Sequence, residues 1–153
     1  MKTKVYLSDE GFGHIVRQRA IISELIKLKP ELSVTLQTHQ HIAFAKSNIK
    51  ATHFIDRFNN IRWHKNSDSS PDIKSIREFY GNYEEVAEKY IRTELLEDYD
   101  FLISDFVYEA FEIADARNIP SFGVAHFTWD WFFSKLYPNP LKPELLNRFF
   151  DSA

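Results

Sequence analysis

The 153-residue sequence contains no cysteine, which excludes a disulfide framework and any metal site built from thiolates. A chain without cysteine fits a reducing compartment, and its Met-Lys-Thr-Lys start lacks a signal-peptide apolar stretch, so we expect a cytoplasmic location. No run approaches the roughly 18 apolar residues that a membrane span needs. With 19 basic and 22 acidic side chains the formal net charge is −3, which argues against nucleic acid as a partner.

Glycine is also scarce, and two of the four glycines in the chain lie close together near the N-terminus. Gly11 and Gly13 separate a short apolar run, Val5–Leu7, from a helical pattern over Ile15–Leu28. This order predicts a strand, a turn and a helix whose first backbone N–H groups are unpaired. Glycines at such a turn let a ligand approach the backbone closely, so Gly11, Phe12 and Gly13 are predicted to line a ligand site.

Two common nucleotide-binding motifs are missing from this turn. The dinucleotide fingerprint G-x-G-x-x-G requires a third glycine where the sequence has Val16. A phosphate-binding P-loop requires Gly-Lys-Ser/Thr, which is also absent. Dinucleotide binding and P-loop chemistry are therefore disfavoured, and the sequence predicts no cofactor.

Apolar strand patterns alternate with helical patterns along the rest of the chain. We expect strands at 4–7, 32–38, 52–55, 101–103 and 121–125, and helices at 15–28, 41–46, 73–96, 107–116 and 144–150, with a long loop over 56–72. Gly81 divides the 73–96 helix, whose buried side is predicted to consist of Ile76, Phe79, Tyr80, Tyr83, Val86, Tyr90 and Ile91. The alternation predicts an α/β fold: one doubly wound parallel sheet of about five or more strands, formed by a single domain over 1–153.

One histidine and one aspartate are predicted to meet at the edge of this sheet. His14 ends the glycine turn, and Asp105 follows the apolar run 101–103. In strand order 3-2-1-4-5, the carboxyl ends of strands 1 and 4 meet at the topological switch point. A carboxylate bound to one imidazole nitrogen makes the other nitrogen a better general base for a hydroxyl group. The alternatives are a His14 satisfied by backbone at the helix start and an Asp105 that caps the following helix.

Other polar side chains give weaker signals. His39 and His41, together with His14 and His126, suggest a metal site, but without an ordered carboxylate partner we predict none. Asp9-Glu10 with Asp105 would suit a phosphoacceptor site of a signalling protein, although no matching lysine follows the fifth strand.

An unusually aromatic segment, 126–137, follows the fifth predicted strand. Its large side chains could form core, or a surface for a partner domain, an acceptor or a second copy of the chain.

Two stretches carry a resemblance to a known family. Gly11-Phe-Gly-His-Ile-Val-Arg17, and Ser104-Asp105 with Asn118-Ile-Pro-Ser-Phe-Gly-Val-Ala-His-Phe-Thr-Trp-Asp130, resemble the N-terminal domain of GT-B glycosyltransferases. The sequence is most similar to the glycosyltransferase-like domain of L-arabinokinases and more distantly similar to UDP-glycosyltransferases. The resemblance implies a Rossmann-like domain, one half of a GT-B fold, in which His14 is the acceptor base and Asp105 its partner.

The same resemblance implies the partners. A nucleotide-sugar donor would be held by a C-terminal domain that is missing from this sequence, and a hydroxyl acceptor by this one. His126, Trp129 and Asp130 become acceptor-side candidates, with core packing or capping as the alternative. Trp131 and Tyr137 could also stack on sugar rings, and Trp63 and His64 are further candidates for acceptor contact. A non-catalytic binding or regulatory module of the same fold is the alternative function.

Overall fold

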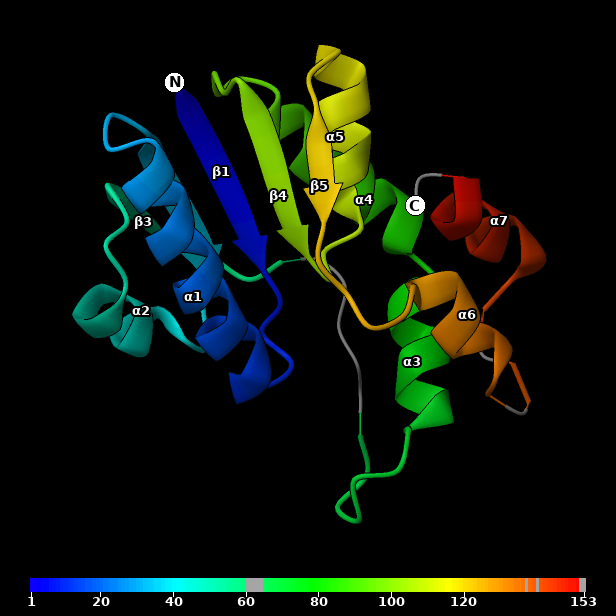
Figure 1. The fold of residues 1–153 in the computed structure, drawn as a ribbon. Helices are drawn as coiled ribbons and strands as arrows, with labels where there is room; N and C mark the ends of the chain where they lie inside the picture. The colour runs from blue at the N-terminus through cyan, green and yellow to red at the C-terminus, as the bar shows by residue number, and fades with distance from the viewer. Residues whose placement is uncertain (60–64, 137, 140, 152–153) are drawn as a thin grey trace.

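The computed structural model describes residues 1–59, 65–136, 138, 139 and 141–151, without the side chains of 146 and 149–151. Trp63, His64 and Tyr137 therefore lie outside the described residues. The described chain forms one parallel sheet with helices on both faces (Figure 1). The strands are β1 (Lys2–Leu7), β2 (Ser33–Thr38), β3 (His53–Asp56), β4 (Phe101–Asp105) and β5 (Ser121–Gly123). Their order, β3-β2-β1-β4-β5, confirms the predicted doubly wound α/β topology.

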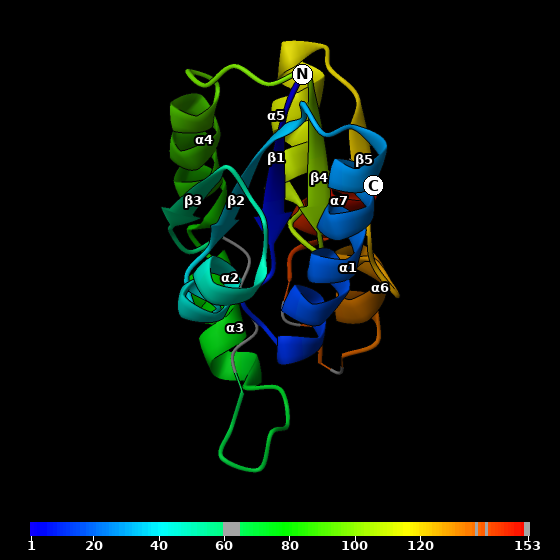
Figure 2. The same ribbon diagram turned by 60° about the vertical axis from the view of Figure 1, so that its left-hand side comes forward.

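Seven helices are present in the described residues; some lie against the faces of the sheet, and α3 and α6 lie beyond the ends of its strands (Figure 2). They are α1 (Phe12–Leu28), α2 (Ile42–Asn48), α3 (Ile73–Tyr80), α4 (Tyr83–Glu94), α5 (Glu109–Arg117), α6 (Trp129–Ser134) and α7 (Pro143–Asp151). Helices α1 and α2 cover one face, and α4 and α5 cover the other. Within the described residues, none of these helices has both the length and the apolar character required to cross a bilayer.

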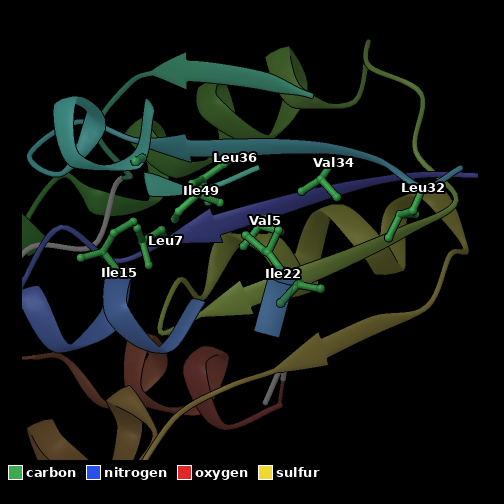
Figure 3. Close-up of a cluster of buried hydrophobic side chains, with 10 residues drawn as sticks. Val5, Leu7, Ile15, Ile22, Leu32, Val34, Leu36 and Ile49 are labelled. Atoms are coloured by element: carbon green, nitrogen blue, oxygen red, sulfur yellow. The ribbon is translucent and has the colours of Figure 1, made fainter. Parts of the chain in front are cut away.

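The face under α1 and α2 is filled by aliphatic side chains (Figure 3). Val5 and Leu7 of β1 point toward this face because alternate residues of a strand share a side. They meet Ile15 and Ile22, which lie seven residues apart on one side of α1. All four side chains are completely buried, so this layer fixes α1 against the centre of the sheet.

The opposite face carries charges that no hydropathy pattern predicts. Lys4 of β1 is fully buried and forms an ion pair with Glu94 of α4. Glu94 also accepts hydrogen bonds from Tyr6, at 2.9 Å, and from Arg57, at 2.5 Å. Burying the Glu94 carboxylate without these partners would lower the stability of the fold by several kcal/mol. The network therefore allows α4 to pack against β1.

A third cluster, beyond the carboxyl ends of the strands, joins α3, α4, α6 and α7. Helix α6 was not among the predicted helices, and Trp129 and Phe133 on it are buried here. The prediction that Val86 is buried is wrong: this residue is 47% exposed, and Ala87 is buried instead. Gly81 and Asn82 separate α3 from α4, and the buried positions keep one helical spacing across this junction: Ile76, Tyr80, Tyr83, Ala87 and Tyr90.

An ionisable pair connects Tyr83, a member of this third cluster, to Glu109 at the start of α5. The hydroxyl of Tyr83 donates to Oε1 of Glu109 at 2.6 Å, and Glu109 has no exposed surface. Burial raises the pKa of Glu109 to about 7, against the hydrogen bond from Tyr83 that lowers it. Its other oxygen, Oε2, has no partner among the described residues, which favours the protonated acid.

Candidate active site

The predicted His14–Asp105 pair is formed at the carboxyl edge of the two central strands. Asp105 is the last residue of β4 and lies opposite Leu7, the last residue of β1. His14 lies in the first turn of α1, which follows β1 after the glycine turn. Nδ1 of His14 is 2.6 Å from Oδ1 of Asp105. The two residues are 91 positions apart in sequence, and the parallel pairing of β1 with β4 brings them together.

Asp105 is a buried carboxylate with a full set of donors. Its side chain has no exposed surface. Nη2 of Arg17 donates to Oδ1 at 2.5 Å, and Nε of Arg17 approaches Oδ2 at 3.3 Å. Nε2 of Gln18 donates to Oδ2 at 2.8 Å. Burial acts to raise the pKa of Asp105, but the hydrogen bonds from His14, Arg17 and Gln18 outweigh it and hold the pKa below its usual value.

These contacts determine the tautomer of His14. Nδ1 lies 2.6 Å from a carboxylate, which can only accept, and 3.1 Å from Nη2 of Arg17, which can only donate. The shorter contact and the ionised state of Asp105 assign the proton to Nδ1, donated to Asp105. Nε2 of His14 then carries a lone pair, and it has no hydrogen-bond partner among the described residues. With 21% of the side chain exposed, this nitrogen can act as a base.

Nδ1 of His14 contacts a carboxylate and not the backbone, and Asp105 does not cap the helix that follows it. The carboxylate of Asp105 points to α1, and the N-cap of α5, Tyr108, has no side-chain capping hydrogen bond. The loop into α5 is held instead by Ser104, whose Oγ accepts from N–H of Val107 at 3.0 Å.

Helix α1 supplies three contacts to the same carboxylate from one face. His14, Arg17 and Gln18 are at positions i, i+3 and i+4, which lie on one side of a helix. The roles of Arg17 and Gln18 were not predicted, although their spacing from His14 in the sequence could have identified both.

Phe106 also contacts the site, and no sequence pattern predicted this contact. It follows Asp105 directly and has φ of 63°, in the left-handed region that bulky residues rarely adopt. Its ring stacks on His14 with the centroids 5.9 Å apart. Its carbonyl accepts a hydrogen bond of 3.0 Å from Nε1 of Trp129. A strained backbone beside a base–carboxylate pair is typical of a functional site.

The remaining predicted residues lie at different places around this centre. His126 is exposed, and its Nε2 is 3.0 Å from Nη1 of Arg17, so it joins the pair through the guanidinium. Trp129 is buried in the third cluster, as the alternative of core packing predicted. Asp130 lies in the first turn of α6, and its Oδ1 has no partner among the described residues. Trp131 is half exposed.

The glycine turn leaves open space in front of α1. Gly11 is the N-cap of α1 with φ of −174°, an extended conformation that any residue adopts. A Cβ added to Gly13 would meet nothing within 4 Å, and Phe12 is 54% exposed. Gly11, Phe12 and Gly13 therefore flank His14 with accessible surface, and neither glycine is required by its backbone angles.

Asp9 and His39 make contacts away from the His14–Asp105 pair. Oδ1 of Asp9 accepts from Oγ1 of Thr38 at 2.7 Å and from two backbone N–H groups of the next two residues, so it holds the loop after β2. His39 is paired with Asp56 at 2.7 Å on an exposed surface. The described residues contain no group of three potential ligands able to hold a metal ion.

A pocket of about 230 Å³ lies beside the pair, with Phe106 as one wall. It opens between β5, the start of α5 and the segment leading to α6.

The fold is similar to that of solved structures, although the sequence has no close match. No family model matches the sequence, and no curated protein matches it. The crystal structure of the glycotransferase of kitacinnamycin is similar, with a TM-score of 0.57, 19% identity and 81% of this chain covered. The chain spans about 30% of the length of that protein. At this identity the likeness concerns the fold, which is that of one part of a glycosyltransferase structure.

Two further solved structures have lower TM-scores. A UGT transferase from Siraitia grosvenorii in complex with UDP has a TM-score of 0.41 and 18% identity, covering 88% of this chain and 26% of its own. The C-terminal domain of a hydrogenase from Pyrococcus furiosus has a TM-score of 0.49 and 13% identity, covering 80% of this chain and 90% of its own.

Proposed function

We propose that this chain is the acceptor-side domain of an inverting glycosyltransferase with GT-B architecture, similar in this part to the domain of L-arabinokinases. The observation that carries the proposal is the 2.6 Å contact between Nδ1 of His14 and the buried carboxylate of Asp105. The contact lies at the switch point of a doubly wound sheet, where such folds bind ligands. The similarity of the fold to part of a glycosyltransferase supports the same conclusion.

In the proposed reaction, Nε2 of His14 accepts the proton of an acceptor hydroxyl. The hydroxyl oxygen attacks the anomeric carbon of a nucleotide sugar, and the bond from that carbon to the nucleoside diphosphate breaks. Asp105 holds the imidazole in the required tautomer and stabilises the imidazolium that forms. The donor is held by a second domain, as in a two-domain enzyme, and the transfer takes place between the two.

The native protein that carries this domain provides the test. Release of nucleoside diphosphate would be measured with a panel of UDP-, GDP- and dTDP-sugars and a mixture of hydroxyl acceptors. His14→Gln should lower kcat by about 10²- to 10⁴-fold, the range of a lost general base. His39→Gln is the matched control, because His39 also contacts a carboxylate at 2.7 Å but on an exposed surface outside the site.

Two results would contradict the proposal. Transfer that survives His14→Gln at near-normal kcat would remove His14 from the chemistry. Absence of any transfer with every donor, in a protein that binds acceptors, would favour the binding module.

A further inference from the structure

The pocket beside His14 has an almost entirely apolar lining. Six of its side chains supply the apolar walls: Phe106, Val107, Phe111, Val124, Phe127 and Trp129. The two buried hydroxyl groups in the lining are already engaged, since Ser104 bonds Val107, and Tyr108 bonds Glu112 and Arg148. Among the described residues, no charged side chain lines the pocket, so none of them compensates the desolvation of a charged ligand group.

The size of the pocket sets the size of the group it can hold. An apolar cavity of about 150 Å³ binds benzene. By that scale, about 230 Å³ accommodates one substituted ring or two fused rings. Rings on several sides favour a planar aromatic occupant, because aromatic pairs gain from stacked and edge-to-face contacts.

Phe106 connects this pocket to the base. Its ring stacks on His14 at 5.9 Å, lies edge-on to Phe127 at 4.7 Å and tilts against Trp129 at 4.3 Å. The left-handed backbone of Phe106, which bulky residues rarely adopt, maintains this position. A ligand in the pocket therefore lies against the residue that also contacts the imidazole.

Gly123 leaves the pocket open on the β5 side. A Cβ at this position would lie 3.1 Å from Cζ of Phe111, closer than most such contacts. Its backbone does not have a positive φ, so a side chain there is not strained by the backbone and would narrow the pocket.

We propose that this pocket binds an uncharged aromatic group of one or two rings that belongs to the acceptor, with the acceptor hydroxyl reaching Nε2 of His14 past the edge of Phe106. This inference rests on the proposed function for the identity of the ligand as acceptor. The pocket itself can be tested by binding, without any sugar transfer.

The probe is 2-naphthol, added to the ¹⁵N-labelled chain and followed by NMR. Binding should shift the indole N–H signal of Trp129, which donates to the carbonyl of Phe106, and give intermolecular contacts to the ring of Phe127. Glucose, which is polar and not planar, should leave these signals unchanged at the same concentration.

Gly123→Val is the informative variant and should weaken 2-naphthol binding at least tenfold. Ser121→Val is its matched control, because Ser121 is two residues away on the same face of β5 and does not line the pocket. If Gly123→Val does not fold, Gly123→Ala gives a smaller change in the same direction.

The outcomes separate the two proposals. No binding by the wild-type chain, contacts to residues elsewhere, or equal affinity in Gly123→Val and Ser121→Val would overturn the pocket assignment and leave the role of His14 intact. Binding at Phe127 and Trp129 together with transfer that does not depend on His14 would support the pocket and refute the proposed reaction.

Discussion

Asp105→Asn tests the centre of the site most directly, because the substitution preserves shape and removes the charge. Asp105 accepts from His14, Arg17 and Gln18, which all donate to it. An asparagine has one acceptor oxygen and one NH₂ group, so one side of the carboxamide must face a donor. If the NH₂ group faces His14, Nδ1 must accept, the proton moves to Nε2, and the base is lost.

The magnitude follows from the burial of the partners. Removing one member of a buried charge pair costs about 3–5 kcal/mol. The side chain of Arg17 is 24% exposed and keeps part of its hydration, and the amide oxygen still accepts one bond, so the lower end applies. We expect the free energy of unfolding to fall by about 3 kcal/mol and Tm to fall by on the order of 10 °C.

Chemical denaturation followed by circular dichroism measures the stability, and ¹⁵N NMR of the imidazole reports the tautomer of His14. Asp56→Asn is the control, since Asp56 contacts His39 at the same kind of distance but is 52% exposed, and its loss should cost less than about 1 kcal/mol. A loss below about 1 kcal/mol in Asp105→Asn would contradict the charge-pair argument, and the tautomer of His14 reports which side of the carboxamide faces it.

Three further predictions concern stability and can be measured by denaturation. Glu94→Gln should cost about 4 kcal/mol because it leaves Lys4 and Arg57 without their buried carboxylate, whereas Glu88→Gln on the exposed side of α4 should cost less than 0.5 kcal/mol. The pKa of Glu109 is raised from 4.5 to about 7, so its contribution of about 3 kcal/mol to the free energy of unfolding is complete below pH 4.5 and is lost as the pH rises through 7. Glu109→Gln should lack this part of the pH dependence, and parallel plots of stability against pH for the variant and the wild type would contradict the assignment. Phe106→Gly should be more stable than Phe106→Ala by about 1 kcal/mol, the reverse of the usual order, because glycine relieves the left-handed backbone; the usual order would show that no strain is present.

The fold could be predicted from the sequence because its central strands are short apolar runs bounded by polar residues. The strands Phe101–Asp105 and Lys2–Leu7 are each two residues longer than predicted, since strand pairing continues into polar positions at the strand ends. Helix α6 was missed because a six-residue, largely aromatic helix has no polar face to reveal its period. Val86 was misplaced because positions three and four residues after Tyr83 both lie near the buried side of a helix, and the structure buries the second of them, Ala87.

The site could be predicted in part. The positions of His14 and Asp105 after two strands that are neighbours in a doubly wound sheet were sufficient to bring them together. The contacts of Phe106 depend on a backbone angle that is unfavourable for its residue type, and local preference predicts the opposite. The sequence does not predict the buried pair of Lys4 and Glu94 either, because lysine and glutamate are usually found on the surface.

The pairing of β1 with β4 also determines at which stage of chain synthesis the site can form. The His14–Asp105 contact closes a loop of 91 residues, which costs about 4 kcal/mol of chain entropy. During synthesis β1 can pair with β2 as soon as Thr38 has emerged, while its other edge stays open until β4 is made. A nascent chain that stops before Asp105 would therefore carry the whole glycine turn and α1 but no oriented base.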